Sequence, residues 1–499
     1  MNLRPYQNKA IEDIRHHFSR GKKRILLVAP TGSGKTVIAS SMMQKANERS
    51  NFNLFVAHRR ELVMQCSRKL GDFGINHGVI MAQKSPNMMA STQVASIQTF
   101  VSRKERDDFI KPHAHLVILD EAHRSVSGQF KSLLGEYPDA YVIGLTATPI
   151  RNDGRALGNI YEELVEAGSI QSLTSEGHLV PNRIVAPSIP DLQKIRIVAG
   201  DYEKRALDKK MNTTKLVGDI VSHYIRFGED RPTIVFATSI AHSKHIANIF
   251  NQNGVPSGHI DSNMNELDRE KQLANLDSGK IKVLSNCQIL SEGWDQPKVS
   301  CVILARPTKS YGLYIQQIGR TLRPYPNKKD TLIIDHSGCV YEHGFPEDTP
   351  NWTLKTTKPK TKDRIKNPDP IEKQPFTCVQ CDTVYKPTKD DYACPNCAFV
   401  PTKKERIVLV QQGRLVELPK MKTKQNANDK QNFYAQLLFY CRQKGYKEGW
   451  ASHTFKQKYG HFPHNKKTFP VAIGKDVMSF IQHLNIRRAK SRNMRELNV

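Results

Sequence analysis

Residues 29–36 read APTGSGKT, and they follow the aliphatic run ILLV at 25–28 and precede a helical pattern. A buried strand, a glycine-containing turn and a helix in this order predict a phosphate-binding loop. Gly32 and Gly34, with Thr31 and Ser33 beside them, let backbone N–H groups surround phosphate oxygens, and the following helix N-terminus adds positive potential. Lys35 can reach the β- and γ-phosphates, and the Thr36 hydroxyl can ligate Mg²⁺. The stretch predicts a nucleoside triphosphate site.

A second stretch carries the acids that such a site needs. The aliphatic run 116–119 leads directly into Asp120, Glu121, Ala122 and His123, and the carboxyl end of a parallel strand faces the ligand crevice. Adjacent residues of an extended chain point to opposite sides, so the two acids are expected to have different tasks. Asp120 is predicted to hold Mg²⁺, and Glu121 to orient and deprotonate the attacking water.

Strand-like and helical segments alternate along the first 340 residues. Apolar runs at 54–57, 116–119 and 142–145 are separated by helical patterns, which is typical of a parallel, doubly wound sheet. A second alternating series runs from 233 to 335 and contains no phosphate loop. The pattern predicts an α/β protein with two tandem parallel-sheet lobes, of which the first binds the nucleotide.

The order of the motifs resembles superfamily 2 helicases and translocases of the DEAH type, whose lobes are RecA-like. The resemblance rests on five stretches: APTGSGKT, VAHRREL (56–62), ASIQTF (95–100), DEAH (120–123) and TATP (146–149). It implies that His123 and the TAT segment couple the nucleotide site to a nucleic-acid groove. It also implies backbone-phosphate contacts from His58, Arg59, Ser96, Gln98 and Thr99. Upstream, the amide of Gln7 in LRPYQ is expected to bond an adenine edge.

The second lobe adds two further motifs. Residues 291–295 (SEGWD) resemble the fifth motif of the family, in which Gly293 and Asp295 line the cleft. Residues 316–323 fit QxxGRxxR, so on a helix Gln316, Arg320 and Arg323 would share one face. That face can present two permanently charged, forked guanidiniums to a γ-phosphate.

Within the superfamily, LRPYQ, TATPIR and the short span between lobes look most like bacterial and phage RadD-type repair helicases and the helicase part of type III restriction enzymes. The resemblance covers about residues 3–340. Two departures are visible: the fifth motif has Ser-Asn-Cys at 285–287 in place of the usual Thr-Ala segment, and the tail has no nuclease-like cluster of acids and lysine.

The charge balance indicates a polyanionic partner. The 499-residue chain has a net charge of +27, which favours nucleic acid. Residues 351–499 hold 30 lysines and arginines against 12 acidic residues, or +18. The start of the chain is not typical of a secretory signal, no apolar run approaches a membrane span, and the cysteine usage suits a reducing compartment. A cytoplasmic, nucleoid-associated protein of a bacterial or phage-infected cell is expected.

Four of the nine cysteines form two CxxC pairs, Cys378/Cys381 and Cys394/Cys397, with twelve residues between the pairs. Two such knuckles can close a tetrahedral Cys₄ site, so a structural Zn²⁺ ribbon is expected, with iron as the alternative metal. The Lys-, Thr- and Pro-rich segment before them is typical of an extended linker. The predicted boundaries are lobe 1 at 1–170, a connecting segment at 171–214, lobe 2 at 215–350, a linker at 351–374, the ribbon at 375–402 and a basic accessory domain at 403–499.

The last 70 residues interleave aromatic side chains with lysines. These aromatics either stack on single-stranded bases while the lysines follow phosphates, or they form the core of a small helical domain. The sequence supports both equally. Removal of residues 351–499 is expected to leave the ATPase motor intact.

Together these features predict an ATP- and Mg²⁺-dependent helicase or translocase acting on DNA, single-stranded or branched, in replication, repair or recombination, alone or with protein partners from those processes. Three alternatives stay open. An RNA helicase shares every motor motif, and the translocation subunit of a restriction system needs a methyltransferase partner. A non-enzymatic, zinc-dependent nucleic-acid binder is disfavoured by the intact nucleotide site.

Overall fold

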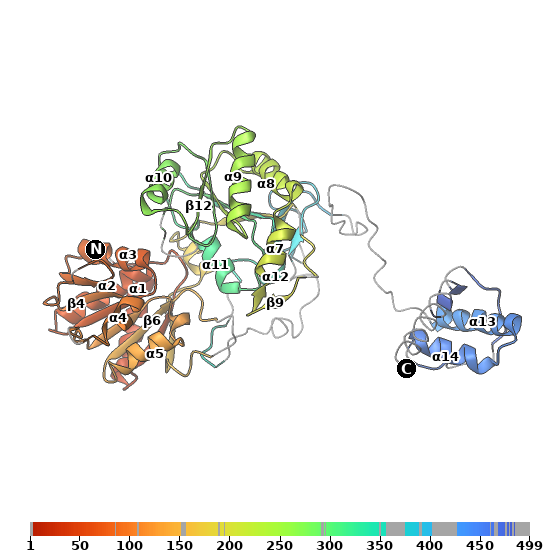
Figure 1. Cartoon of the computed structure of the whole chain (residues 1–499), viewed down its shortest axis with the longest axis horizontal. Coiled ribbons are helices and arrows are strands. Elements are labelled where there is room, and N and C mark those ends of the chain that lie inside the picture. The colour runs from red at the N-terminus through yellow and green to blue at the C-terminus, as the bar shows by residue number, and fades with distance from the viewer. Residues whose placement is uncertain are drawn as a thin grey trace. The chain divides into compact units, whose positions relative to one another are not determined.

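The computed structural model describes residues 3–84, 86–106, 109–150, 156–187, 190–193, 195–290, 294, 296–348, 351–355, 375–388, 392–401, 427–459, 461–463, 468–474, 477–478, 480–481 and 484. The chain divides into two compact units, Met1–Val410 and Gln411–Val499. The first unit holds two sheet lobes, coloured red to orange and yellow to green in Figure 1.

Lobe 1 is built on a seven-stranded parallel sheet of order β3-β4-β2-β5-β6-β1-β7. Its strands are β1 (Arg24–Val28), β2 (Asn53–Ala57), β3 (His77–Ile80), β4 (Thr92–Ser96), β5 (Leu116–Leu119), β6 (Tyr141–Thr146) and β7 (Glu163–Glu166). The expected strands at 54–57, 116–119 and 142–145 are present. The sequence did not predict strands β3, β4 and β7.

Both faces of this sheet are buried. Along β1, Ile25 and Leu27 enter one hydrophobic cluster, whereas Leu26 and Val28 enter another, because successive side chains point to opposite faces. This arrangement explains the unbroken aliphatic run in the sequence. The helices of the lobe are α1 (Pro5–Ser19), α2 (Lys35–Asn47), α3 (Arg60–Asp72), α4 (Ile97–Arg103), the 3₁₀ turn η1 (Ala122–Arg124), α5 (Gly128–Gly135) and, after β7, α6 (Ile170–Ser175).

Lobe 2 contains an eight-stranded sheet of order β12-β13-β11-β14-β15-β8-β17-β16. Its strands are β8 (Asn182–Val185), β11 (Thr233–Phe236), β12 (Ser257–Ile260), β13 (Val283–Asn286), β14 (Cys301–Leu304), β15 (Thr331–Asp335), β16 (Phe376–Thr377) and β17 (Thr383–Tyr385). Its helices are α7 (Lys204–Met211), α8 (Thr214–Phe227), α9 (Ile240–Gln252), α10 (Glu266–Asp277), α11 (Tyr311–Gly319) and α12 (Cys339–His343), with a small β9 (Ile197–Val198) and β10 (Asp201–Tyr202) hairpin. The fold class expected from the sequence, two parallel-sheet lobes, is confirmed.

Two segments lie elsewhere than the sequence suggested. Strand β8, from the supposed connecting segment, pairs parallel with β15 inside the lobe 2 sheet. Strand β17, from the cysteine module, pairs antiparallel with β8, and Val384 of β17 is buried in the lobe 2 core. The cysteine module therefore completes the edge of lobe 2. Removal of all residues after 350 would expose β8, so a truncation that leaves the motor whole has to end beyond the cysteines.

The expected linker is only partly described. Residues 356–374 lie outside the described residues. Before them, Trp352 and Leu354 pack against the lobe 1 core, and Gly158 N donates to Leu354 O at 3.0 Å. The chain therefore contacts lobe 1 after it has left lobe 2.

The second unit contains α13 (Ala427–Lys444) and α14 (Glu448–Tyr459). Four of its aromatic side chains, Phe433, Tyr434, Tyr440 and Phe455, are at most 8% exposed and form its core. For these four, the structure decides between the two interpretations in favour of the core. Tyr446 and Phe462 are exposed, and Lys456 Nζ lies 4.6 Å from the centre of the Phe462 ring.

None of the helices in the described part of the chain combines the length and the apolar character that crossing a membrane requires.

Candidate functional site

The phosphate-binding loop connects β1 to α2 at the carboxyl end of the lobe 1 sheet. Gly32 and Gly34 have φ angles of 91° and 84°, in the left-handed region that glycine adopts without strain. Helix α2 begins at Lys35, with Gly34 as its N-cap, and Ser33 is buried. The backbone of the loop thus has the conformation expected of a phosphate cradle, and Thr36 occupies the first turn of the helix.

The side chain of Lys35 turns back over this loop. Its Nζ donates to Ala29 O at 3.2 Å. Burial lowers the pKa of Lys35, while the charges of Glu121 and Asp120 act in the opposite direction. The cation of the loop and the acid pair after β5 therefore lie within electrostatic reach of each other.

The acid pair is buried and sharply turned. Asp120 and Glu121 are 7% and 5% exposed, and Glu121 N donates to Asp120 Oδ1 at 2.9 Å. The prediction that both acids continue an extended strand is wrong, because Glu121 has a φ of 50° and starts the 3₁₀ turn η1. His123, in that turn, places Nδ1 at 3.3 Å from Glu121 Oε2.

Gln7 lies against the phosphate loop. It is 4% exposed, and its Nε2 donates to Ser33 O at 3.0 Å, which also accepts from the Tyr6 hydroxyl at 2.5 Å. A Cβ on Gly34 would lie 2.7 Å from Gln7 Nε2, so a side chain at this position would displace the Gln7 amide. The adenine contact of Gln7 stays a prediction.

Lobe 2 presents α11 to the acid pair. Gln316 Nε2 donates to Glu121 Oε2 at 3.3 Å, and both side chains are buried. The backbone of α11 approaches lobe 1 closely, because a Cβ on Gly319 would lie 2.5 Å from Thr31 Cβ and one on Gly312 would lie 2.8 Å from Thr148 Oγ1. The first contact involves the phosphate loop and the second the TAT segment after β6.

Helix α11 ends before Arg323, so the prediction that Arg323 shares a helical face with Gln316 is wrong. Helix α11 ends at Gly319, where the chain passes the phosphate loop, and Arg320 is the C-cap. Arg320 Nη1 donates to Trp294 O at 2.8 Å. Arg323 lies beyond the helix, and its Cγ is 3.1 Å from where a Cβ on Gly32 would be. Burial lowers the pKa of Arg323 to about 10, which leaves it charged at neutral pH.

Comparison with known proteins identifies the family of the chain. Residues 1–151 match the family described as type III restriction enzyme, res subunit, and residues 216–325 match the helicase conserved C-terminal domain. A 51.5 kDa protein of a Lactococcus phage is 31% identical over 328 residues, which cover 66% of this chain and 68% of the phage protein. The chain belongs to helicase superfamily 2.

This helicase also matches a putative ATP-dependent helicase, IRC3, of Saccharomyces cerevisiae. The two are 31% identical over 357 residues, 68% of this chain and 52% of the yeast protein, so the chain spans about half the length of that relative. Among solved structures, an ATP-dependent type ISP restriction-modification enzyme bound to DNA has a TM-score of 0.53 at 18% identity. That match covers 68% of the helicase and 28% of the restriction-modification enzyme, and it supports the fold.

The residues expected to contact nucleic acid lie together after two adjacent strands of the helicase. His58 and Arg59 follow β2. Ser96 is the last residue of β4 and the register partner of Ala57, and Gln98 and Thr99 lie in the first turn of α4. Gln98 Nε2 donates to His58 O at 2.8 Å, and Ser96 Oγ donates to Gln98 Oε1 at 2.8 Å. Their contact with nucleic acid stays a prediction. Gly293 and Asp295 of the fifth motif lie outside the described residues.

Sequence reasoning missed a pair of ion pairs between the lobes. Arg60 Nη2 lies 3.4 Å from Glu266 Oε2, and Arg269 Nη1 lies 3.4 Å from Glu61 Oε1. Both ion pairs join the first turn of α3 to the first turn of α10. Helix α3 contributes the arginine to one pair and the glutamate to the other. No signal in the sequence links residues more than 200 positions apart, and the charges themselves look like ordinary helix-surface residues.

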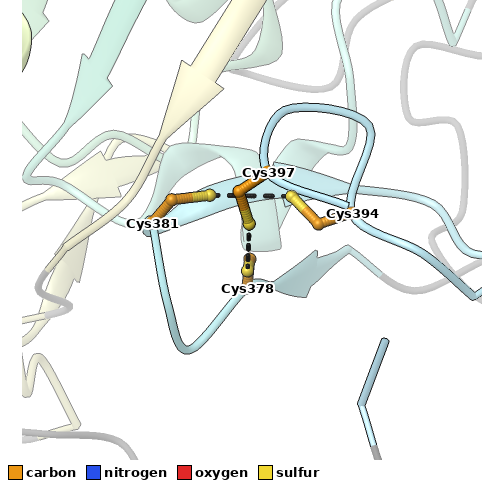
Figure 2. A group of neighbouring side chains, drawn as sticks. All are labelled: Cys378, Cys381, Cys394 and Cys397. Atoms are coloured by element: carbon orange, nitrogen blue, oxygen red, sulfur yellow. Dashed lines mark hydrogen bonds between the residues drawn. The ribbon is translucent and has the colours of Figure 1, made fainter. Parts of the chain in front are cut away.

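The four cysteines of the CxxC pairs converge (Figure 2). All four sulfur atoms lie within 4.8 Å of one another, with Cys378 Sγ 3.6 Å from Cys397 Sγ and Cys381 Sγ 3.6 Å from Cys394 Sγ. Zn–S bonds of about 2.3 Å in a tetrahedron separate neighbouring sulfurs by about 3.8 Å. The donor set and its spacing thus fit a closed, structural Zn²⁺ site.

We expect loss of this site to destabilise lobe 2, because β17 is held between the cysteine knuckles and β8. Cys378→Ser should release the metal and lower the melting temperature of the protein by about 5 °C or more, as a loss of a few kcal/mol would. Calorimetry together with metal analysis by mass spectrometry measures both effects and tells zinc from iron. Cys287→Ser, at a half-buried cysteine outside the cluster, is the control. Metal loss at an unchanged melting temperature would mean that the ribbon folds independently of lobe 2.

Proposed function

We propose that this chain is an ATP-dependent DNA helicase or translocase, which couples ATP hydrolysis to movement on DNA in replication, repair or recombination. The observation that carries the proposal is the contact between Gln316 of lobe 2 and Glu121 of lobe 1. Because a residue of lobe 2 contacts the proposed catalytic acid of lobe 1, the state of the nucleotide is coupled to the closure of the lobes, which ATP favours and hydrolysis reverses.

The proposed roles follow from the geometry of the cleft. The loop amides of 31–36 and Lys35 hold the phosphates, and Thr36 and Asp120 hold Mg²⁺, which neutralises phosphate charge. Glu121 orients and deprotonates the attacking water. Arg320 and Arg323 supply positive charge from lobe 2, so ATP favours the closed arrangement and hydrolysis removes that preference. The close approach of Gly312 to Thr148 transmits the change to the TAT segment.

DNA is the proposed track for three reasons. The candidate contacts His58, Arg59, Ser96, Gln98 and Thr99 lie together beyond the carboxyl ends of β2 and β4. The strong positive charge of the chain favours a polyanion. The fold is similar to that of a restriction-modification enzyme whose structure was solved bound to DNA. The proposed location is the cytoplasm, close to the nucleoid, with replication or repair proteins as partners.

The test is the stimulation of ATPase activity by different nucleic acids. Single-stranded, forked and duplex DNA and single-stranded RNA of equal length are compared at one salt concentration. We expect kcat to rise at least about tenfold with DNA and much less with RNA. Stronger stimulation by RNA would favour an RNA helicase, and stimulation only by long duplex DNA would favour a restriction-type translocation subunit.

A chain that ends at residue 401 is the matched control for the second unit, since it retains the cysteine module and both lobes. It should hydrolyse ATP with the same kcat. Its affinity for DNA should depend less steeply on salt, by about 0.7–0.9 in the logarithmic slope for each phosphate that the second unit neutralises in the full-length protein. Equal slopes would mean that the second unit serves a protein partner.

A further inference from the structure

Lys328, which belongs to none of the motifs, stabilises the turn that carries Arg320 and Arg323. Lys328 Nζ donates to three backbone carbonyl oxygens: Thr321 O at 2.5 Å, Val299 O at 2.6 Å and Pro297 O at 3.0 Å. An ammonium has three N–H donors, and here each has an acceptor. Thr321 lies between Arg320 and Arg323.

Neighbouring bonds hold the same turn. Thr321 O also accepts from Thr331 Oγ1 at 2.5 Å, at the start of β15. The next carbonyl, Leu322 O, accepts from Val180 N at 2.8 Å, and the Leu322 side chain is fully buried. The carbonyls of Thr321 and Leu322 are therefore both fixed to lobe 2, one by β15 and the other by the segment before β8.

Lys328 also links the two segments that are joined by the hydrogen bond from Arg320 to Trp294 O. Pro297 and Val299 follow Trp294, whose carbonyl accepts from Arg320. The lysine thus joins the segment that carries the arginines to the segment that carries their anchor. Burial, together with the positive charges of Arg323 and Arg231 and against the negative charge of Asp330, lowers the pKa of Lys328 to about 7. The three carbonyl acceptors favour the protonated form against this effect, because a neutral amine could donate to only two of them.

We propose that Lys328 is a positioning residue of the ATPase, whose ammonium fixes the turn between Arg320 and Arg323 and so directs Arg323 to the phosphate loop. The inference rests on the proposed function of the cleft. Its physical basis is that a displacement of about 1 Å in a group that stabilises the transition state can cost about 10²-fold in rate.

The test uses the full-length chain with Lys328→Met, which keeps the apolar stem and removes the donors. We expect kcat for DNA-stimulated ATP hydrolysis to fall at least about tenfold, while KM for ATP changes less than about threefold. Lys328→Arg keeps a charged donor and should recover part of the loss. Lys329→Met, at the exposed neighbouring lysine, should leave kcat unchanged.

A double-mutant cycle with Arg323→Ala separates positioning from general stability. If Lys328 acts through Arg323, Lys328→Met should cost almost nothing further in the Arg323→Ala background. If Lys328→Met does not fold, Thr331→Val removes one bond to the same carbonyl and should show the same non-additivity with a smaller loss. Additive effects, or a kcat of Lys328→Met equal to that of the unaltered protein, would overturn the proposal. An unaltered protein that fails to hydrolyse ATP would instead overturn the proposed function.

Discussion

Glu121→Gln is expected to lower kcat for ATP hydrolysis by about 10²–10⁴-fold, the usual contribution of a general base. The amide keeps the shape of the carboxylate and can still accept from Gln316, so the contact between the lobes survives. It cannot take a proton from water. Binding of ATP and of DNA should therefore persist, and steady-state kinetics with a fluorescent-nucleotide titration measures the two effects separately.

Two comparisons sharpen this expectation. Lys35→Ala should weaken ATP binding itself, because Lys35 is placed to contact phosphate oxygens in the ground state. Glu105→Gln, at an exposed acid outside the cleft, should change neither quantity. If Glu121→Gln hydrolyses ATP at the unaltered rate, the catalytic assignment of Glu121 is wrong and another group activates the water.

The sequence was most informative where local pattern and function coincide. The phosphate loop and the acid pair follow the aliphatic runs 25–28 and 116–119, which lie in β1 and β5. These runs are aliphatic throughout because both faces of the sheet are covered. The positions of Lys35, Asp120 and Glu121 at the carboxyl edge of the sheet followed from that rule. Their conformations did not, since the left-handed backbone of Glu121 depends on the turn it starts.

At the end of α11, the periodicity of the sequence is not sufficient to predict the structure. A spacing of zero, four and seven predicts one helical face, yet the helix ends at Gly319. That glycine passes so close to Thr31 that a side chain would collide. The constraint comes from a residue nearly 290 positions earlier, and no local pattern contains it. Arg323 nevertheless reaches the loop, because the turn is held by Val180, which precedes β8, and by Thr331 of β15.

The sheet edge of lobe 2 shows the same limitation. Short strands such as β8 and β17 carry weak sequence signals, and their pairing joins residues about 200 positions apart. The sequence therefore assigned β8 to a connecting segment and β17 to a separate ribbon, although both strands pair in the lobe 2 sheet. In the second unit, burial of Phe433, Tyr434, Tyr440 and Phe455 could not be told from stacking, because an aromatic residue suits a core as well as a base.

Arg323→Ala is the second substitution for which we expect a large effect, a fall in kcat of about 10³-fold or more, as for other arginines that stabilise transferring phosphoryl groups. The side chain reaches the phosphate loop from the opposite lobe, so its charge meets the phosphates only when the lobes are closed. Because that contact strengthens as negative charge develops, kcat should fall by much more than KM rises.

The control variants follow from the chemistry of the side chain. Arg323→Lys keeps a charge but loses the planar fork, so it should recover only part of the rate. Arg15→Ala, at an exposed arginine on α1, should have no effect. Kinetics as a function of ATP concentration, with saturating DNA, provides the measurement. A rise in KM at constant kcat would show that Arg323 binds the ground state of ATP, in which case closure of the lobes precedes hydrolysis without accelerating it.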